Sequence, residues 1–256
     1  MSTDPTPDAP NRSATAPDRL VLLRGASVVT MDPAPGAVAA GHASMPPPRA
    51  DTFVVTGVHV RTRPGTVAPG ELHVVGKRLG GGPADPRVEV IGADGAHAVP
   101  LLVDSAVAQL PPARRGGYDL VPGNPATFAV VRRPVTEAQV RTVLVVDPRD
   151  LLAVWVAGHL EAWDGEPTRT AGEDVADPAV RAAWVGTWED PHHGLLQHLR
   201  PDGRYSETRG GRADAYTGRY WLHEDRITYL DDSGFWAFGQ LLDGVLHHAG
   251  FVMTRR

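Results

Sequence analysis

The sequence contains no cysteine. Disulfides, thiolate zinc sites, iron–sulfur clusters and cysteine nucleophiles are therefore excluded, and any metal ion would have to be held by His, Asp or Glu. Long apolar runs are also missing: the best candidate, residues 151–158 (LLAVWVAG), is far shorter than the roughly 20 residues that span a bilayer. A formal net charge of -5 gives no basic surface for nucleic acid. We expect a cytoplasmic protein with no membrane or nucleic-acid partner.

Glycine and proline are abundant, with 28 and 24 residues in a chain of 256. Together they exceed the roughly 12% of an average chain, which favours short strands and turns over long helices. We predict a mainly all-β protein in four segments. They are a disordered tail (1–19), a β-sandwich (20–165), a linker with a short helix that Asp177 caps (166–183), and a small antiparallel barrel (184–256).

The first β-rich half carries a family resemblance. Its runs LLRGASVVTMDP (22–33), GELHVVGKRLGG (70–81) and VEVIGADGAHAVPLLVDS (88–105) resemble the amino-terminal strands of the composite β-sandwich in the amidohydrolase superfamily. Residues 116–165 resemble the strands that return to that sandwich after the family's metal-binding TIM barrel. Only about ten residues separate the two groups of strands, whereas a TIM barrel needs about 250.

The metal ligands of that family are missing as well. The resemblance places Ala106 and Ala108 where the family has two histidines, and alanine cannot ligate a metal ion. The remaining histidines of this half are isolated in strands or turns and are interpreted as structural: His59, His73, His97 and His159. This half is therefore expected to be a relic without amidohydrolase activity.

The last 73 residues predict an antiparallel meander of seven or eight short strands. Asp243 and Gly244 predict a tight hairpin, and a Gly-x-Trp triplet at 186–188 resembles the first strand of lipocalins. Residues 199–220, 227–240 and 244–250 resemble an uncharacterised family of small bacterial proteins. That resemblance implies a streptavidin-like or lipocalin-like up-and-down barrel.

An eight-stranded barrel has room for packed side chains or one small ligand. Strand alternation places Tyr205, Glu207 and Arg209 on one face, and adjacent His247 and His248 on opposite faces, with the outer histidine exposed. Several polar side chains would then need partners or a ligand. The candidate proton-transfer residues are His198, His247 and His248, oriented by Asp231 or Asp232. The candidate ligand-binding residues are Arg209, Tyr216, Tyr229, Trp236 and Tyr205.

These residues predict that the barrel binds a small, partly apolar organic molecule. Cofactor-free acid–base catalysis of the isomerase, dehydratase or cyclase type is one extension of this hypothesis. The alternative is a non-catalytic carrier or an oligomerisation scaffold, and a homodimer is left open. We expect no cofactor and no metal site, because the sequence contains neither a His-x-His nor a His-Glu-x-x-His motif.

Overall fold

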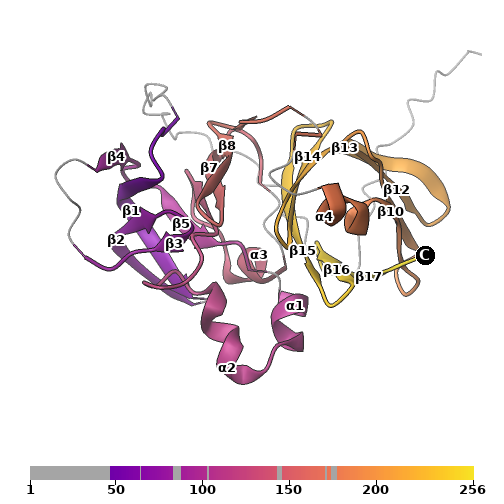
Figure 1. The fold of residues 1–256 in the computed structure, drawn as a ribbon, viewed down its shortest axis with the longest axis horizontal. Helices are drawn as coiled ribbons and strands as arrows, with labels where there is room; N and C mark the ends of the chain where they lie inside the picture. Colours follow the sequence, from indigo (N-terminus) through magenta and orange to yellow (C-terminus); the bar gives the residue numbers. More distant parts are fainter. Residues whose placement is uncertain are drawn as a thin grey trace, which may run out of the picture.

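The computed structural model describes residues 47–63, 65–82, 88–102, 104–142, 146–170, 172–173 and 178–256. The predicted tail, the first strand run (22–33) and the predicted helix cap at Asp177 lie outside these ranges. What is described is mainly β-structure, as predicted, and forms a sheet and a closed barrel that lie side by side (Figure 1).

The sheet has nine strands in the order β3-β2-β1-β5-β6-β7-β8-β9, with the short β4 pairing in parallel with β1. Its strands are β1 (Thr52–Arg63), β2 (Thr66–Val75), β3 (Arg78–Leu79), β4 (Glu89–Gly92), β5 (His97–Pro100), β6 (Phe128–Val131), β7 (Leu151–Val156), β8 (His159–Trp163) and β9 (Glu166–Pro167). β9 lies in the segment predicted as a linker. One face of the sheet packs around Phe53, Phe128 and Trp155, and the other face covers the barrel.

Short helices connect the strands of the sheet. Between β5 and β6 lie α1 (Asp104–Gln109), α2 (Pro112–Arg115) and the 3-10 turn η1 (Gly116–Tyr118). α3 (Glu137–Thr142) follows β6. Ala106 is buried and Ala108 exposed in α1, where the resemblance placed a metal-ligand pair. No helix in the described part of the chain is long and apolar enough to cross a membrane.

The barrel is a closed meander of eight antiparallel strands in which β10 pairs with β17. The strands are β10 (Gly186–Asp190), β11 (Leu195–Leu199), β12 (Arg204–Arg209), β13 (Arg212–His223), β14 (Arg226–Asp231), β15 (Trp236–Leu242), β16 (Val245–His248) and β17 (Phe251–Arg255). The Asp243–Gly244 hairpin is confirmed, because both residues have the positive φ angles (49° and 79°) of a tight turn. α4 (Pro178–Trp184) precedes the barrel.

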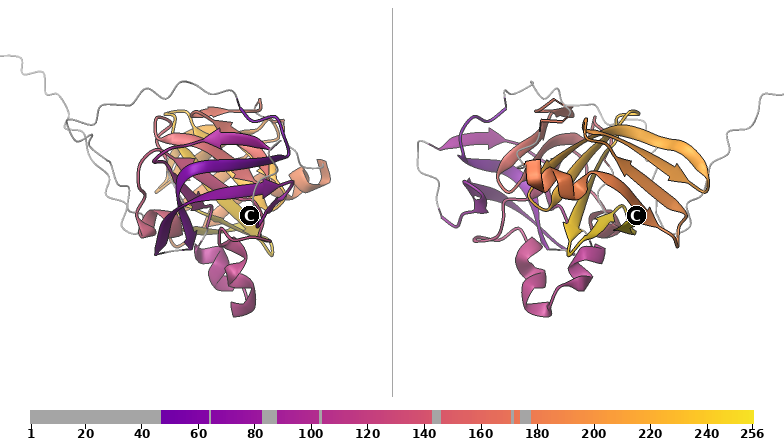
Figure 2. Two further views of the ribbon diagram at one scale, coloured as in Figure 1. Left: turned by 90° about the vertical axis from the view of Figure 1, so that its left-hand side faces the viewer. Right: turned by 45° about the vertical axis from the view of Figure 1, so that its right-hand side comes forward.

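The sheet and barrel share one hydrophobic core. Trp221, Trp236 and Phe238 point outward from the barrel and pack on Leu151 and Val154 of the sheet. Viewed from the sheet side, the sheet lies over the barrel (Figure 2). Hydrogen bonds also cross this seam. Val146 and Trp236 exchange two backbone bonds of 2.9 Å, and the Trp221 Nε1 donates to the Thr170 carbonyl at 3.0 Å.

Candidate functional site

One end of the barrel interior is apolar. Trp184 of α4 and Trp188 of β10 are each 1% exposed, and the Trp188 Nε1 donates to the Trp184 carbonyl at 2.8 Å. Leu199, Tyr220 and Leu222 complete this cluster. Trp188 is the tryptophan of the Gly-x-Trp triplet that resembles the first strand of lipocalins. We call this the tryptophan end. Its two indoles pack within the core of the barrel.

The middle of the interior holds a buried polar network centred on Glu207. Glu207 shares the inner face of β12 with Tyr205, and its carboxylate accepts hydrogen bonds from Gln197 (3.1 Å) and from the Arg209 Nε (2.8 Å). The Tyr229 hydroxyl donates to the Gln197 Oε1 at 3.0 Å. Gln197, Glu207 and Tyr229 are buried, so their polar atoms satisfy one another away from water.

His248 faces the same network. Its Nδ1 donates to the Phe238 carbonyl at 3.2 Å, its Nε2 lies 3.9 Å from the Glu207 Oε1, and its ring centroid lies 4.3 Å from that of Tyr229. Burial lowers the pKa of His248 below its usual value, outweighing the nearby Glu207. Burial also raises the pKa of Tyr229 and of Tyr205. At neutral pH the imidazole is therefore uncharged and both phenols keep their protons.

The opposite end of the barrel carries a guanidinium between aromatic rings. The Arg209 Cζ lies 4.5 Å from the Tyr216 ring centroid and 5.0 Å from that of Phe251. The His193 ring meets Phe251 edge-on, and the His193 Nδ1 lies 2.8 Å from the Asp190 Oδ2. Tyr216 is 45% exposed, so this end reaches solvent. These residues define the arginine end.

Comparison with known proteins identifies the barrel. A family model described as Agrobacterium tumefaciens protein Atu4866 matches residues 181–255. The solution structure of that protein is 42% identical over 28% of this chain and 92% of its own, with a TM-score of 0.26 over the whole comparison. Through its barrel, the chain belongs to the Atu4866 family. None of the curated proteins matches the chain.

Two predicted catalytic residues, His198 and Asp232, lie outside the interior of the Atu4866-family barrel, and Asp231 is bonded within the turn at the end of β14. His198 points outward from β11, with its Nδ1 3.0 Å from the Thr187 Oγ1. Asp231 accepts a 2.7 Å bond from the Ser233 backbone, and Asp232 pairs with Arg204 at 2.7 Å on the surface. The two aspartates therefore orient neither His247 nor His248.

His247 and Trp236 also lie on the outer face of the barrel. His247 and His248 point to opposite faces, as alternation predicted, but the prediction that the outer one is exposed was wrong. His247 is 1% exposed because it packs under α1, where its Nδ1 lies 2.9 Å from the Ser105 Oγ. Trp236 is covered by the sheet, and its Nε1 donates to the Gly165 carbonyl at 3.1 Å. Neither side chain can line the interior.

The structure thus brings together Tyr205, Arg209, Tyr216, Tyr229 and His248 of the ten predicted residues. Sequence reasoning omitted Gln197 and Glu207, which join the members of this group. Glu207 could have been found, because it alternates with Tyr205 and Arg209 on β12. Gln197 had no such signal, since apolar residues occupy both faces of β11.

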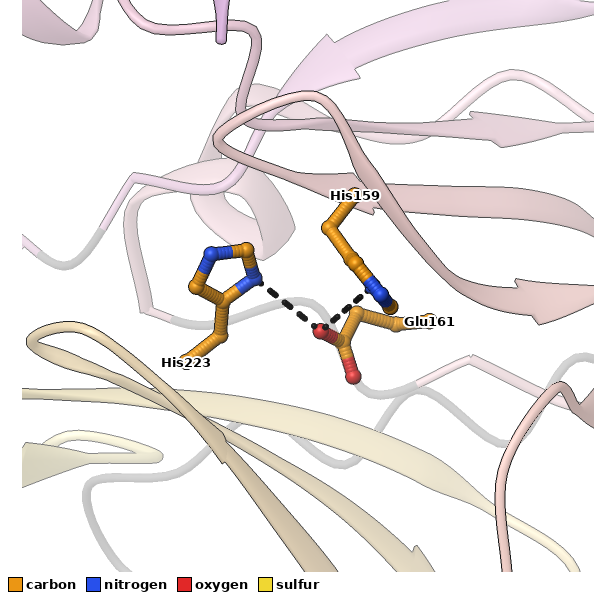
Figure 3. A group of neighbouring side chains, drawn as sticks. All are labelled: His159, Glu161 and His223. Atoms are coloured by element: carbon orange, nitrogen blue, oxygen red, sulfur yellow. Dashed lines mark ion pairs between the residues drawn. The ribbon is translucent and has the colours of Figure 1, made fainter. Parts of the chain in front are cut away.

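Among the described residues, one group has the donor atoms and spacing to hold a metal ion. It lies outside the Atu4866-family barrel interior, at the seam with the sheet, and consists of His159, Glu161 and His223 (Figure 3). Burial alone would raise the pKa of Glu161, but the two imidazoles and the Arg169 guanidinium outweigh it and hold that pKa at about 2. Glu161 is therefore ionised throughout the neutral range.

Proposed function

We propose that the arginine end of the barrel binds a small, partly apolar organic molecule. The observation that supports this proposal is the contrast between the two ends of one barrel. The chain fills the tryptophan end with apolar side chains, yet places the buried Glu207 carboxylate, paired with the partly exposed Arg209 guanidinium, beneath the arginine end. A buried ion pair is seldom more stabilising than apolar residues of similar size. Its presence is better explained by recognition than by stability.

The chemistry of the arginine end selects the ligand class. Tyr216 is 45% exposed, and the Arg209 guanidinium contacts both its ring and that of Phe251. Arg209 already has its charge balanced by Glu207, so it can orient an acceptor group without demanding a full negative charge. We therefore propose a ligand with one planar apolar part that stacks on Tyr216 and one carbonyl or carboxylate that faces Arg209.

A screen of small aromatic acids and amides against the full chain tests this proposal. Binding would be followed by ligand-observed NMR for the wild-type protein, for Tyr216→Ala and for Phe235→Ala. Phe235 is the matched control, because it is 43% exposed against 45% for Tyr216 but lies outside the site, just before β15. We expect hits whose affinity drops at least about tenfold in Tyr216→Ala only. Equal loss in both variants, or no hits, would refute the proposal.

A scaffold without a ligand is the second candidate. It is favoured by the mutual pairing of Gln197, Glu207 and Tyr229, which leaves these groups no need of a ligand. Native mass spectrometry of the purified chain separates the two functions. A bound mass of a few hundred daltons supports the ligand site, whereas a ligand-free dimer supports the scaffold. Acid–base turnover would depend on His248 alone, because the other predicted histidines lie outside the interior.

We also propose that the sheet descends from the amidohydrolase-type sandwich. The support is its topology: the chain leaves the sheet after β5 for the short helices α1 and α2 and returns at β6, the antiparallel neighbour of β5. This is the place where the resemblance puts the missing TIM barrel. A structure search with the sheet alone would contradict this origin if it matched other folds better than amidohydrolase sandwiches.

A further inference from the structure

The seam between sheet and barrel contains a group of ligand atoms from both parts. His159 and Glu161 lie two residues apart on β8, and Glu161 is the extra residue of a bulge, since Val154 pairs with Ala162 and Trp155 with Leu160. Bulges redirect side chains and are frequent beside functional sites. His223 ends β13 and points outward from the barrel toward Glu161 (Figure 3).

These side chains converge without bonding well to one another. The Glu161 Oε1 lies 3.6 Å from the His159 Nδ1 and 3.4 Å from the His223 Nδ1. All three atoms are buried and have no hydrogen-bond partner in the described structure. The Glu161 side chain is 1% exposed and that of His223 is 6% exposed. A buried polar atom without a partner is destabilising, so this arrangement favours a further occupant.

We infer that His159 Nδ1, Glu161 Oε1 and His223 Nδ1 bind one divalent transition-metal ion. The spacing supports this assignment. Ligands that stand about 2.0–2.2 Å from a tetrahedral ion lie about 3.4 Å from one another, close to the two observed distances. Two imidazoles and one carboxylate suit zinc or ferrous iron, whereas calcium and magnesium prefer oxygen ligands. A metal ion here would depart from the sequence-based expectation of no metal site.

Arg169 determines which oxygen of Glu161 could coordinate the metal ion. Its guanidinium binds the Glu161 Oε2 directly, which leaves the Oε1 as the free ligand atom and favours single-oxygen coordination. Such outer contacts orient metal ligands and tune their affinity. The guanidinium also balances the carboxylate charge. We therefore expect weaker binding than an unpaired carboxylate would give.

The site has an opening as well as a buried side. The His159 side chain is 38% exposed, whereas the other two ligands are buried. Three protein ligands leave a fourth position, and in zinc enzymes that position holds water or substrate. The seam thus provides a metal with one exchangeable position near the His159 edge. Because two ligands come from the sheet and one from the barrel, the ion would also tie the two parts together.

Zinc titration of the untagged full chain tests the inference. After treatment with a chelator, wild-type protein, His159→Ala, His223→Gln and the control His192→Ala would be titrated by calorimetry. His192 is an exposed histidine in the turn after β10, outside the site. We expect one zinc ion per wild-type chain, at least about 100-fold weaker binding in the two site variants, and no change in the control. Magnesium should not compete.

NMR of nitrogen-15-labelled histidines gives a second readout that does not depend on a variant folding. Zinc should shift the Nδ1 signals of two histidines and leave their Nε2 signals as the unligated positions. His159→Ala should remove one of the two shifted signals, and this partly exposed residue is the safer substitution. No zinc binding in the wild type, unchanged affinity in both site variants, or ligation through other histidines would overturn the inference. None of these outcomes bears on the arginine end.

Discussion

The pair of the buried Glu207 and the partly exposed Arg209 offers the most direct test of why the barrel interior is polar. Arg209→Met would leave the Glu207 carboxylate, which is 3% exposed, without its cationic partner. Breaking a buried ion pair costs about 3–5 kcal/mol. Glu207→Gln should cost less, because the Arg209 side chain is 21% exposed and can turn toward solvent. The double variant removes both charges and should lie within about 1–2 kcal/mol of the wild type.

Urea unfolding followed by tryptophan fluorescence measures these differences. With a urea slope of about 3 kcal/mol/M, the Arg209→Met cost corresponds to a midpoint lowered by about 1 M or more. Far-UV circular dichroism of each variant before unfolding controls for a changed fold. The reasoning depends on non-additivity between the two substitutions. If the two single costs simply add in the double variant, the pair is not coupled and the argument from its burial fails.

Three further predictions use other parts of the chain. Because burial lowers the pKa of His248 in the folded state, the unfolded state binds more protons below about pH 6.5. The urea concentration at the unfolding midpoint should therefore decrease as the pH is lowered from 7 to 5.5. The decrease should be smaller in His248→Gln. Arg169→Gln should strengthen zinc binding several-fold in calorimetry, because the Glu161 carboxylate would lose the guanidinium that balances its charge, and unchanged or weaker binding would contradict this role. Gly218→Ala should cost about 1–3 kcal/mol in urea unfolding, because its Cβ would lie 2.3 Å from the Leu230 carbonyl, whereas Gly92→Ala meets no atom and should be tolerated.

The barrel could be predicted from sequence because local signals agree along it. Turn residues separate the strands, and alternation placed Tyr205 and Arg209 on one face. Of the seven or eight strands predicted, eight are found, since residues 245–255 form two strands, β16 and β17, joined at Ala249 and Gly250. Both residues have positive φ angles, 47° and 82°. Alanine rarely adopts this conformation, so Gly250 is the one residue of the pair that signals the turn.

The seam could not be predicted, because alternation fixes which residues share a face but not which face is buried. Trp236 and Phe238 look like interior residues from their size, yet the smaller Ala237 and Gly239 point into the barrel. Large residues can lie on the outer face of β15 because the sheet covers that face and shields them from water. The same tertiary contact buries His247, which an isolated barrel would expose to solvent.

The seam is also where the two parts of the chain acquire something that neither has alone. The Atu4866 family model matches residues 181–255 and so contains His223 but neither His159 nor Glu161. The barrel network is closed within the barrel, since Glu207, Gln197 and Tyr229 find their partners there. The metal-ligand atoms of His159, Glu161 and His223, by contrast, have no hydrogen-bond partner among the described residues and come together where β8 meets β13. A ligand at the arginine end would therefore belong to the barrel itself, whereas a metal ion at the seam would belong to this combination of sheet and barrel.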